Sequence, residues 1–418
     1  MSQPVNQTAR RIAVVLTGYI PSHHVRSINT VRHAEAFARL GHSVEVFAPL
    51  TRREDRFLRG IDSPQAFYGV DGSISFSLIP HNRLYYHASH PLGRLIVGLG
   101  KRLTGYRLSY VCDAEQRIAR TIRDGRFDLA YCRARRVPWY LIQMGIPTVV
   151  EMHSTDVTPE VTRLLSRGSD PAFRALSTIA PSLADQYAAL GVPREKILVQ
   201  EDAVDTERFA AVTQDRQTLR TQLGWPLDLP LVVYCGGIYP GKAIADLLVL
   251  AQQLHRRATA EGTTVPRVLV VGGPDANRLS FQAEAQRRGV TNVDFLPAVP
   301  HPRVPHVLKA ADALVMLYNL AESQSVMDRG TTSPVKLFEY MASGTPFVCS
   351  ALPPIEKIVT HGTHALLPTP GDHAATADAV WTLLHDRTRA ATLAAAAQQR
   401  AADFTYIKRV STILGAAH

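Results

Sequence analysis

Short runs of consecutive apolar residues alternate with amphipathic segments along the first half of the chain. The apolar runs are RIAVVLT at 11–17, SVEVFAP at 43–49, FDLAYC at 127–132, PTVVEM at 147–152 and LSTIA at 176–180. Runs without polar alternation are typical of strands that are buried on both faces. A helical pattern at 29–40, which Gly41 ends, separates the first two runs, so we expect parallel strands joined by helices.

The same rhythm restarts in the second half of the chain. The expected elements are strands within 228–235, 266–273 and 293–299, a helix at 243–257, and a helix that runs into a strand at 306–318. The polar, proline-containing stretch at 206–230 is interpreted as the linker, and the alanine-rich stretch at 374–402 as helical. The predicted fold class is α/β, with two doubly wound, Rossmann-like domains facing each other across a cleft.

The length of 418 residues also favours two domains over one hydrophobic core. We place an N-terminal domain at 1–210, a C-terminal domain at 211–400, and a final helix at 401–418 that packs back on the N-terminal domain. Hydrophobic residues make up 46% of the chain and charged residues 20%, which is typical of a globular protein.

Targeting and metal-binding signals are weak. No run approaches the ~18 apolar residues of a membrane-spanning helix, and the polar start MSQPVNQTARR lacks a signal-peptide core, so we expect a cytoplasmic protein. The four cysteines have neither metal-site nor disulfide-framework spacing.

The formal net charge is +10, and residues 83–107 mix arginine and lysine with aromatic and aliphatic residues. Such a stretch is compatible with a solvated face, with a contact to an anionic membrane surface, or with a nucleic-acid patch. No nucleic-acid-binding module accompanies it, so we do not expect a nucleic-acid partner. The membrane contact would make the protein peripheral at the inner face of the membrane.

Ligands of open parallel sheets bind where strands lead into helix N-termini, and two loops at such places carry polar groups. The loop at 18–27, GYIPSHHVRS, begins with Gly18 but lacks a dinucleotide fingerprint. The loop at 234–244, YCGGIYPGKAI, has a glycine turn and Lys242, which suits a phosphate-bearing ligand. Ala243 stands where a P-loop has the serine or threonine that holds magnesium, which disfavours a P-loop NTPase.

The third candidate is the segment TTSPVKLFEYMASG at 331–344. We expect Ser333 to be the N-cap of a helix, Pro334 its first residue, and Gly344 the residue just past its end. Free amides at the helix start, with the hydroxyls of Thr331 and Thr332, would attract an anion. Glu339 lies about 8–9 Å further along the axis, where a carboxylate would accept bonds from sugar hydroxyls. A surface glutamate on an amphipathic helix is the alternative.

Together these residues resemble the family-4 retaining glycosyltransferases of the GT-B fold, in the subgroup with an S-P-x-K helix start. The resemblance extends through nearly the whole chain. Its most specific part is SPVKLFEYMASGTPFVCSALPPIEKIV at 333–359, and GGIYPGK, ILVQEDAVDTERF and FARLGHSVEVF also fit.

The resemblance implies transfer of a sugar from a nucleotide diphospho-sugar to a glycan, lipid-linked or small-molecule acceptor, with retention of anomeric configuration. Lys242 would neutralise the donor diphosphate, the amides from Ser333 to Val335 would hold it, and Glu339 would bind the ribose. Gly18 would close on the donor from the other domain. His153 matches a family histidine near the donor sugar, with a structural strand-end histidine as the alternative.

The sequence departs from the family pattern at two positions. Gly237 stands where the family usually has an arginine beside the phosphates, and Thr331 stands where it has the first glutamate of a pair. Charge stabilisation would then depend on Lys242, with Lys336 and the helix end, and no cofactor or metal is expected.

Two other functions remain open. A nucleotide-sugar epimerase would use the same fold but would need acid and base carboxylates that Glu339 alone does not supply. A nucleotide- or glycan-binding protein without transfer activity is the other alternative, because the family arginine and first glutamate are missing.

Overall fold

The computed structural model describes residues 8–18, 20–50, 63–80, 111–239, 243–319 and 333–417. The chain divides into two compact units, which are described separately below. The N-terminal unit comprises Met1–Gln200 together with Tyr406–His418, and the C-terminal unit comprises Glu201–Thr405. The divisions expected from the sequence are at residues 210 and 400.

The N-terminal unit contains a seven-stranded parallel sheet in the order β3-β2-β1-β4-β5-β6-β7. Its strands are β1 (Arg11–Leu16), β2 (Ser43–Leu50), β3 (Ile74–Pro80), β4 (Leu129–Arg133), β5 (Thr148–Glu151), β6 (Phe173–Thr178) and β7 (Ile197–Val199). Its helical elements are α1 (Val25–Arg39), α3 (Pro64–Tyr68), α5 (Val111–Asp124), α6 (Val137–Gln143), α7 (Pro159–Leu165), α8 (Pro181–Ala189), η2 (Arg194–Lys196) and α19 (Tyr406–Ala416). Helix α1 packs against α19, and α5 packs against α6. Because parallel crossovers are right-handed, these two helix pairs cover opposite faces of the sheet.

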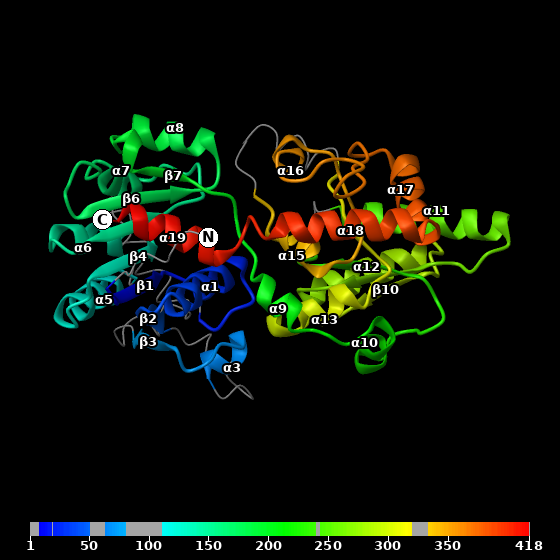
Figure 1. Ribbon diagram of the computed structural model, residues 1–418, viewed down its shortest axis with the longest axis horizontal. Helices are drawn as coiled ribbons and strands as arrows, with labels where there is room; N and C mark the ends of the chain where they lie inside the picture. The colour runs from blue at the N-terminus through cyan, green and yellow to red at the C-terminus, as the bar shows by residue number, and fades with distance from the viewer. Residues whose placement is uncertain are drawn as a thin grey trace, which may run out of the picture. The chain divides into compact units, whose positions relative to one another are not determined.

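The C-terminal unit contains a five-stranded parallel sheet in the order β10-β9-β8-β11-β12. Its strands are β8 (Leu231–Cys235), β9 (Arg267–Val271), β10 (Val293–Leu296), β11 (Ala313–Met316) and β12 (Phe347–Cys349). Its helical elements are α9 (Thr206–Ala210), α10 (Arg216–Leu223), α11 (Ile244–Glu261), α12 (Asp275–Arg287), η3 (His301–Arg303), α13 (Val304–Lys309), α15 (Val335–Ser343), α16 (Pro353–Glu356), α17 (His373–His385) and α18 (Arg387–Ala401). Figure 1 shows these elements by label and colour.

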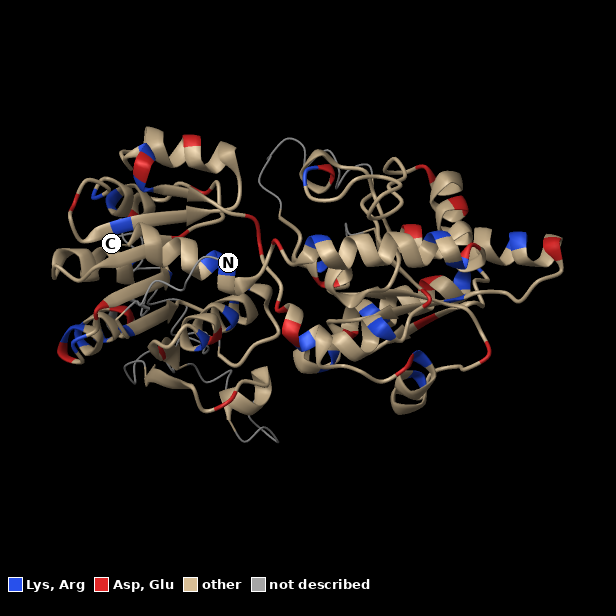
Figure 2. Ribbon diagram, viewed as in Figure 1, with Lys and Arg blue, Asp and Glu red and all other residues tan. Residues whose placement is uncertain are grey.

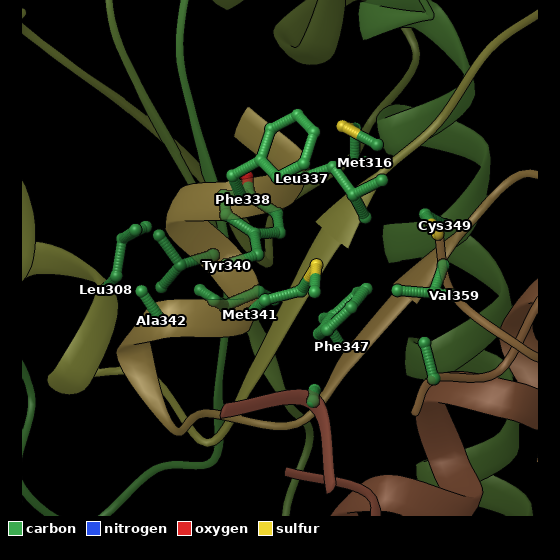
Figure 3. Packing of buried hydrophobic residues seen from close by; sticks show 14 of the residues in the cluster. Leu308, Met316, Leu337, Phe338, Tyr340, Met341, Ala342, Phe347, Cys349 and Val359 are labelled. Atoms are coloured by element: carbon green, nitrogen blue, oxygen red, sulfur yellow. The ribbon is translucent and has the colours of Figure 1, made fainter. Parts of the chain in front are cut away.

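Alternate residues of the C-terminal strands enter two different cores. On β8, Leu231 and Val233 belong to the cluster that contains α15, whereas Val232 and Tyr234 belong to the cluster that contains α11. Figure 3 shows the first cluster, in which Leu337, Phe338, Tyr340 and Met341 pack beside Met316, Phe347 and Cys349. Both faces of the sheet are therefore buried, as the continuous apolar runs predict.

The stretch at 206–230 is not a simple linker, which corrects the interpretation from sequence. It contains helices α9 and α10, and both lie within the C-terminal unit. Asp205 and Asp215 cap them by accepting hydrogen bonds from the amides of Arg208 and Thr218. Polar composition suggested a linker because N-cap residues and linker residues are chemically alike.

Helix α19 is joined to the N-terminal sheet by the buried side chain of Arg409. Its Nε donates to Nε2 of His33 at 3.0 Å, and Nη1 donates to the carbonyl of Gln200 at 2.7 Å. Nη2 also lies 3.6 Å from Oε1 of Glu151. Burial is the main cause that lowers the pKa of His33, to about 4, so its imidazole is neutral at pH 7. The last helix of the chain thus completes the core of the first unit.

Tyr340 is the residue through which we test the packing of α15. Its buried hydroxyl accepts from the amide of Cys235 at 3.1 Å and donates to the carbonyl of Val315 at 3.2 Å. Tyr340→Phe leaves both backbone groups without this partner and should lower the free energy of unfolding by about 1–3 kcal/mol, measured by urea denaturation. Tyr239→Phe, at an exposed tyrosine, is the matched control and should change little. Equal stability of the two variants would contradict the assigned role of the Tyr340 hydroxyl.

Candidate active site

The N-terminus of α15 lies beside the carboxyl end of β8 in the C-terminal unit. The Tyr340 hydroxyl bonds to β8 and β11 and so fixes the helix at the sheet edge where parallel sheets bind ligands. The helix runs from Val335 to Ser343, and Gly344 follows it with a φ of 68°, which confirms the predicted glycine just past the helix end. The amides of Val335 and Lys336 stand in the first turn, where helix amides have no intrahelical acceptor.

Lys336 brings a cation to this helix start. Its Nζ donates to the hydroxyl of Tyr234 at 3.1 Å and lies 4.9 Å from the centre of that ring. Burial opposes the charge, but Tyr234, Tyr318 and Cys235 outweigh it and raise the pKa of Lys336 above its ordinary value. Lys336 is therefore charged at neutral pH, next to the free amides of the helix.

Ser333 and Pro334 differ from their predicted roles. Pro334, not Ser333, is the N-cap of α15, and no side chain caps the helix. The buried hydroxyl of Ser333 accepts instead from the amide of Asp202 at 2.8 Å. The cap prediction was wrong because a buried backbone amide outside the helix takes the hydroxyl as its acceptor.

Glu339 is partly buried and has a partner that the sequence did not reveal. Its Oε1 lies 3.1 Å from Nε2 of His301, and the two side chains are 15% and 19% exposed. His301 comes from η3, which follows strand β10. The pair leaves Oε2 of Glu339 as an acceptor for a ligand hydroxyl. In the sequence, the only indication that His301 belongs to a site is its position after an expected strand.

The loop after β8 approaches the loop after β9 closely. A Cβ atom on Gly272 would lie 1.7 Å from the carbonyl oxygen of Gly236, so these backbones pack without room for a side chain. Gly237 accepts a hydrogen bond from the Tyr234 hydroxyl through its carbonyl at 2.8 Å. Tyr234 therefore connects Gly237 to Lys336 across the sheet edge.

Three of the predicted site residues, Lys242, Thr331 and Thr332, lie outside the described residues. The basic stretch at 83–107 also lies outside them. Of the predicted donor-binding set, the structure places Gly237, Ser333, Pro334, Val335 and Glu339 on or beside α15 and β8.

The N-terminal unit has its own cavity at the carboxyl ends of β1, β4 and β5. Its volume is about 830 Å³. The lining includes four arginines and three glutamates, namely Arg26, Arg133, Arg135, Arg136, Glu115, Glu151 and Glu160, together with Thr17, His153 and Ser154. Figure 2 shows basic and acidic positions interspersed on the ribbon of this unit.

His153 contacts a basic and an acidic residue in this cavity. Its Nδ1 lies 2.9 Å from Nη2 of Arg133, and its Nε2 lies 2.8 Å from Oε1 of Glu151. Arginine only donates, so Nδ1 is the acceptor in this contact and the ring proton is on Nε2, which is within ion-pair distance of the carboxylate without hydrogen-bond geometry to it. The contacts fix both the tautomer and the orientation of the ring, which lies at the wall of a cavity and not within the core.

Glu151 is the buried centre of this region, since its side chain has no exposed surface. Nitrogen atoms of Arg133, His153 and Arg409 lie 3.6, 2.8 and 3.6 Å from its carboxylate. Removing one partner from a buried ion pair is strongly destabilising, so these neighbours matter for the fold of the region. Composition and motifs gave no signal for Glu151, whose role depends on residues from three distant segments.

Gly18 lies just beyond the end of β1. A Cβ atom there would meet the Leu16 side chain at 3.5 Å, an ordinary contact. A residue with a Cβ atom would therefore fit among the described residues, so their packing does not require glycine at position 18.

Metal-binding clusters and membrane-spanning helices are both absent from the part of the chain that the structure describes. No group of three or more His, Cys, Asp or Glu side chains there is arranged to hold a metal ion. None of the described helices carries an apolar stretch long enough to cross a bilayer.

Two doubly wound parallel units in series, each with polar groups at its carboxyl edge, define the GT-B class of proteins. The family model described as Glycosyltransferase Family 4 matches residues 29–208, and the model described as Glycosyl transferases group 1 matches residues 215–400. The chain belongs to these family-4 glycosyltransferases, as the sequence resemblance implied.

Curated relatives include D-inositol 3-phosphate glycosyltransferases. The protein of Nocardia farcinica is 29% identical over 58% of this chain and 52% of its own length. The protein of Stackebrandtia nassauensis is 31% identical over 59% of this chain and 54% of its own length. The matched region thus spans about half the length of these relatives.

Solved structures show the same fold. Anabaena HepE, in complex with UDP and glucose, has a TM-score of 0.67 at 16% identity and covers 97% of this chain and 99% of its own. A glycosyltransferase from Rickettsia africae has a TM-score of 0.66 at 12% identity, over 97% of this chain and 98% of its own.

The pH dependence of folding stability at Glu115 tests the description of the N-terminal cavity. The residue is 3% exposed, and burial raises the pKa of its carboxyl group to about 7. The positive charge of the neighbouring Arg136 lowers this pKa, but by less than burial raises it. Its folded pKa exceeds the ordinary value, so the folded chain loses stability as pH rises from about 4.5 through 7. Glu115→Gln should be more stable than the parent by on the order of 3 kcal/mol at pH 8, and about equal at pH 4.

Urea denaturation across this pH range measures the difference. Glu195→Gln, at an exposed glutamate of the same unit, is the matched control variant. A Glu115→Gln variant with a constant difference at all pH values would show that the carboxyl does not titrate as described.

Proposed function

We propose that the chain transfers a sugar from a nucleotide diphospho-sugar to an acceptor, with retention of anomeric configuration. The single observation that carries the proposal is the group of anion-binding and hydroxyl-binding atoms around α15. Free amides and the charged Lys336 stand at its first turn, and the Glu339 carboxylate stands about 6 Å further along the axis from Val335. Family membership and the HepE complex with UDP-glucose support a donor of this class.

In this proposal the C-terminal unit binds the donor. The amides of Val335 and Lys336 donate to the diphosphate together with the Lys242 ammonium, and the Thr331, Thr332 and Ser333 hydroxyls lie around it. Oε2 of Glu339 accepts from the ribose hydroxyls while His301 holds Oε1. Gly237 keeps the β8 loop free of side-chain bulk near the phosphates.

The N-terminal unit binds the acceptor, and Gly18 and His153 are the residues of this unit proposed to bind sugar. The bond between the anomeric carbon and the phosphate oxygen breaks, and a bond to the acceptor oxygen forms on the same face. The acceptor proton passes to the leaving phosphate. Lys242, Lys336 and the helix end stabilise the charge that develops on that phosphate, without a metal or other cofactor.

The acceptor is a glycan, a lipid-linked sugar or a small molecule. The curated relatives are named for a small acceptor, D-inositol 3-phosphate. A contact of 83–107 with an anionic membrane surface would place the protein at the inner face of the membrane, and high salt should then weaken that association.

A panel of nucleotide sugars, incubated with the chain and followed by mass spectrometry, tests the proposal. Transfer or slow hydrolysis of one donor, with the product anomer assigned by NMR, is the expected result. Interconversion of two nucleotide sugars would identify an epimerase. Saturable nucleotide binding without turnover of any donor would identify a binding protein.

Glu339→Gln tests the proposed ribose contact. The variant should raise the donor KM at least about tenfold and change kcat less, because the lost interaction is made in the ground state as well. Steady-state kinetics with varied donor gives both values. Glu356→Gln, at an exposed glutamate of the same unit, is the matched control. An unchanged donor KM in Glu339→Gln would make Glu339 a structural partner of His301 only.

A further inference from the structure

The cavity of the N-terminal unit has an uneven charge distribution. Each of three arginines has an acidic partner: Arg136 lies 2.6 Å from Glu160, Arg133 lies 3.6 Å from Glu151, and Arg135 lies 3.6 Å from Asp156. The first two pairs are at least partly shielded from solvent. The Arg135–Asp156 pair is open, with side chains 42% and 73% exposed, and such pairs contribute little.

Arg26 differs from the other three arginines. It lies on the first turn of α1, and no carboxylate of the described residues lies within ion-pair distance of it. Its charged neighbour is another cation, since desolvation and then the positive charge of Arg135 lower the pKa of Arg26. Arg26 and Arg135 thus both line the cavity, and of the two only Arg135 has a carboxylate of the described residues within ion-pair distance, that of the exposed Asp156.

We propose that Arg26 and Arg135 bind a phosphate group carried by the acceptor. Planar guanidinium groups recognise phosphate through paired hydrogen bonds, and two of them can share one dianion. Both side chains remain accessible to a ligand, because Arg26 is exposed and Arg135 is partly exposed. This inference rests on the proposed function only in calling the ligand an acceptor.

The rest of the cavity fits the hydroxyl-bearing part of such an acceptor. A volume of about 830 Å³ is enough for a phosphorylated sugar or polyol. Glu160, whose side chain is 35% exposed, lines the same cavity and would repel a phosphate, but its carboxylate can accept hydrogen bonds from hydroxyls. The charges therefore orient the ligand, with its phosphate at Arg26 and Arg135 and its hydroxyls toward the Glu160 carboxylate and His153.

Calorimetric titration of the full chain tests this site. The probes are inorganic phosphate, glucose 6-phosphate and unphosphorylated glucose, with a nucleoside diphosphate in excess to occupy the donor site. Glucose 6-phosphate should bind, and glucose should bind at least about tenfold more weakly. A parallel titration with a polyprenyl phosphate in detergent micelles shows whether a lipid or a soluble phosphate ester is preferred. Either ester supports the proposal, and no binding of any phosphate probe overturns it.

Variants then assign the binding to the two arginines. Arg26→Ala and Arg135→Ala should each weaken glucose 6-phosphate binding at least about tenfold, and Arg26→Lys should lose less because it keeps the charge. Arg194→Ala is the matched control, because Arg194 is an exposed arginine of the same unit that pairs with the exposed Asp185. Thermal unfolding and nucleoside diphosphate affinity should stay at parent values in all four variants.

The outcomes separate this proposal from the proposed function. Parent-like binding of glucose 6-phosphate in Arg26→Ala and Arg135→Ala overturns the phosphate site. A loss of nucleoside diphosphate affinity in these variants, with sugar-phosphate binding kept, also overturns it and assigns the arginines to the donor. Phosphate binding that depends on Arg26, in a chain that turns over no nucleotide sugar, confirms the site and removes the transferase function.

Discussion

Helices cover both faces of each parallel sheet, so strand side chains can meet a ligand only where the strands end. Along β8, alternate residues enter two separate cores until the strand ends at Cys235. The same holds at the ends of β1, β4 and β5, where the N-terminal cavity opens. Burial of the sheets therefore determines where both candidate sites lie, before any particular side chain is considered.

At these edges, buried polar contacts fix the groups that would bind ligands. The Tyr340 hydroxyl connects α15 to two strands, and Lys336 bonds to Tyr234 of β8, so the free amides of α15 have a fixed place. In the N-terminal unit, the buried carboxylate of Glu151 lies within 4 Å of His153 and of Arg409 from the last helix. Both sites thus depend on buried side chains, those of Tyr340 and Arg409, that are not proposed to contact a ligand.

The sequence was sufficient to predict the fold class and most of the strands, because a short apolar run without alternation is typical of a strand that is buried on both faces. The edge strands β3 and β7 were not among the expected runs. It also located the segment at 333–344 and its closing glycine. It failed for Ser333, whose hydroxyl binds a distant amide, and for the stretch at 206–230, where helix caps resemble a linker. The partners His301 and Glu151 could not be predicted, because their contacts join segments far apart in the sequence.

The central claim is that the N-terminus of α15 binds the diphosphate of a nucleotide sugar. A crystal structure of the chain with the donor that it turns over tests this claim most directly. We predict diphosphate oxygens within hydrogen-bond distance of the Val335 and Lys336 amides, and ribose hydroxyls at the Glu339 carboxylate. A nucleotide bound elsewhere, with these groups left in contact with solvent, would contradict the account.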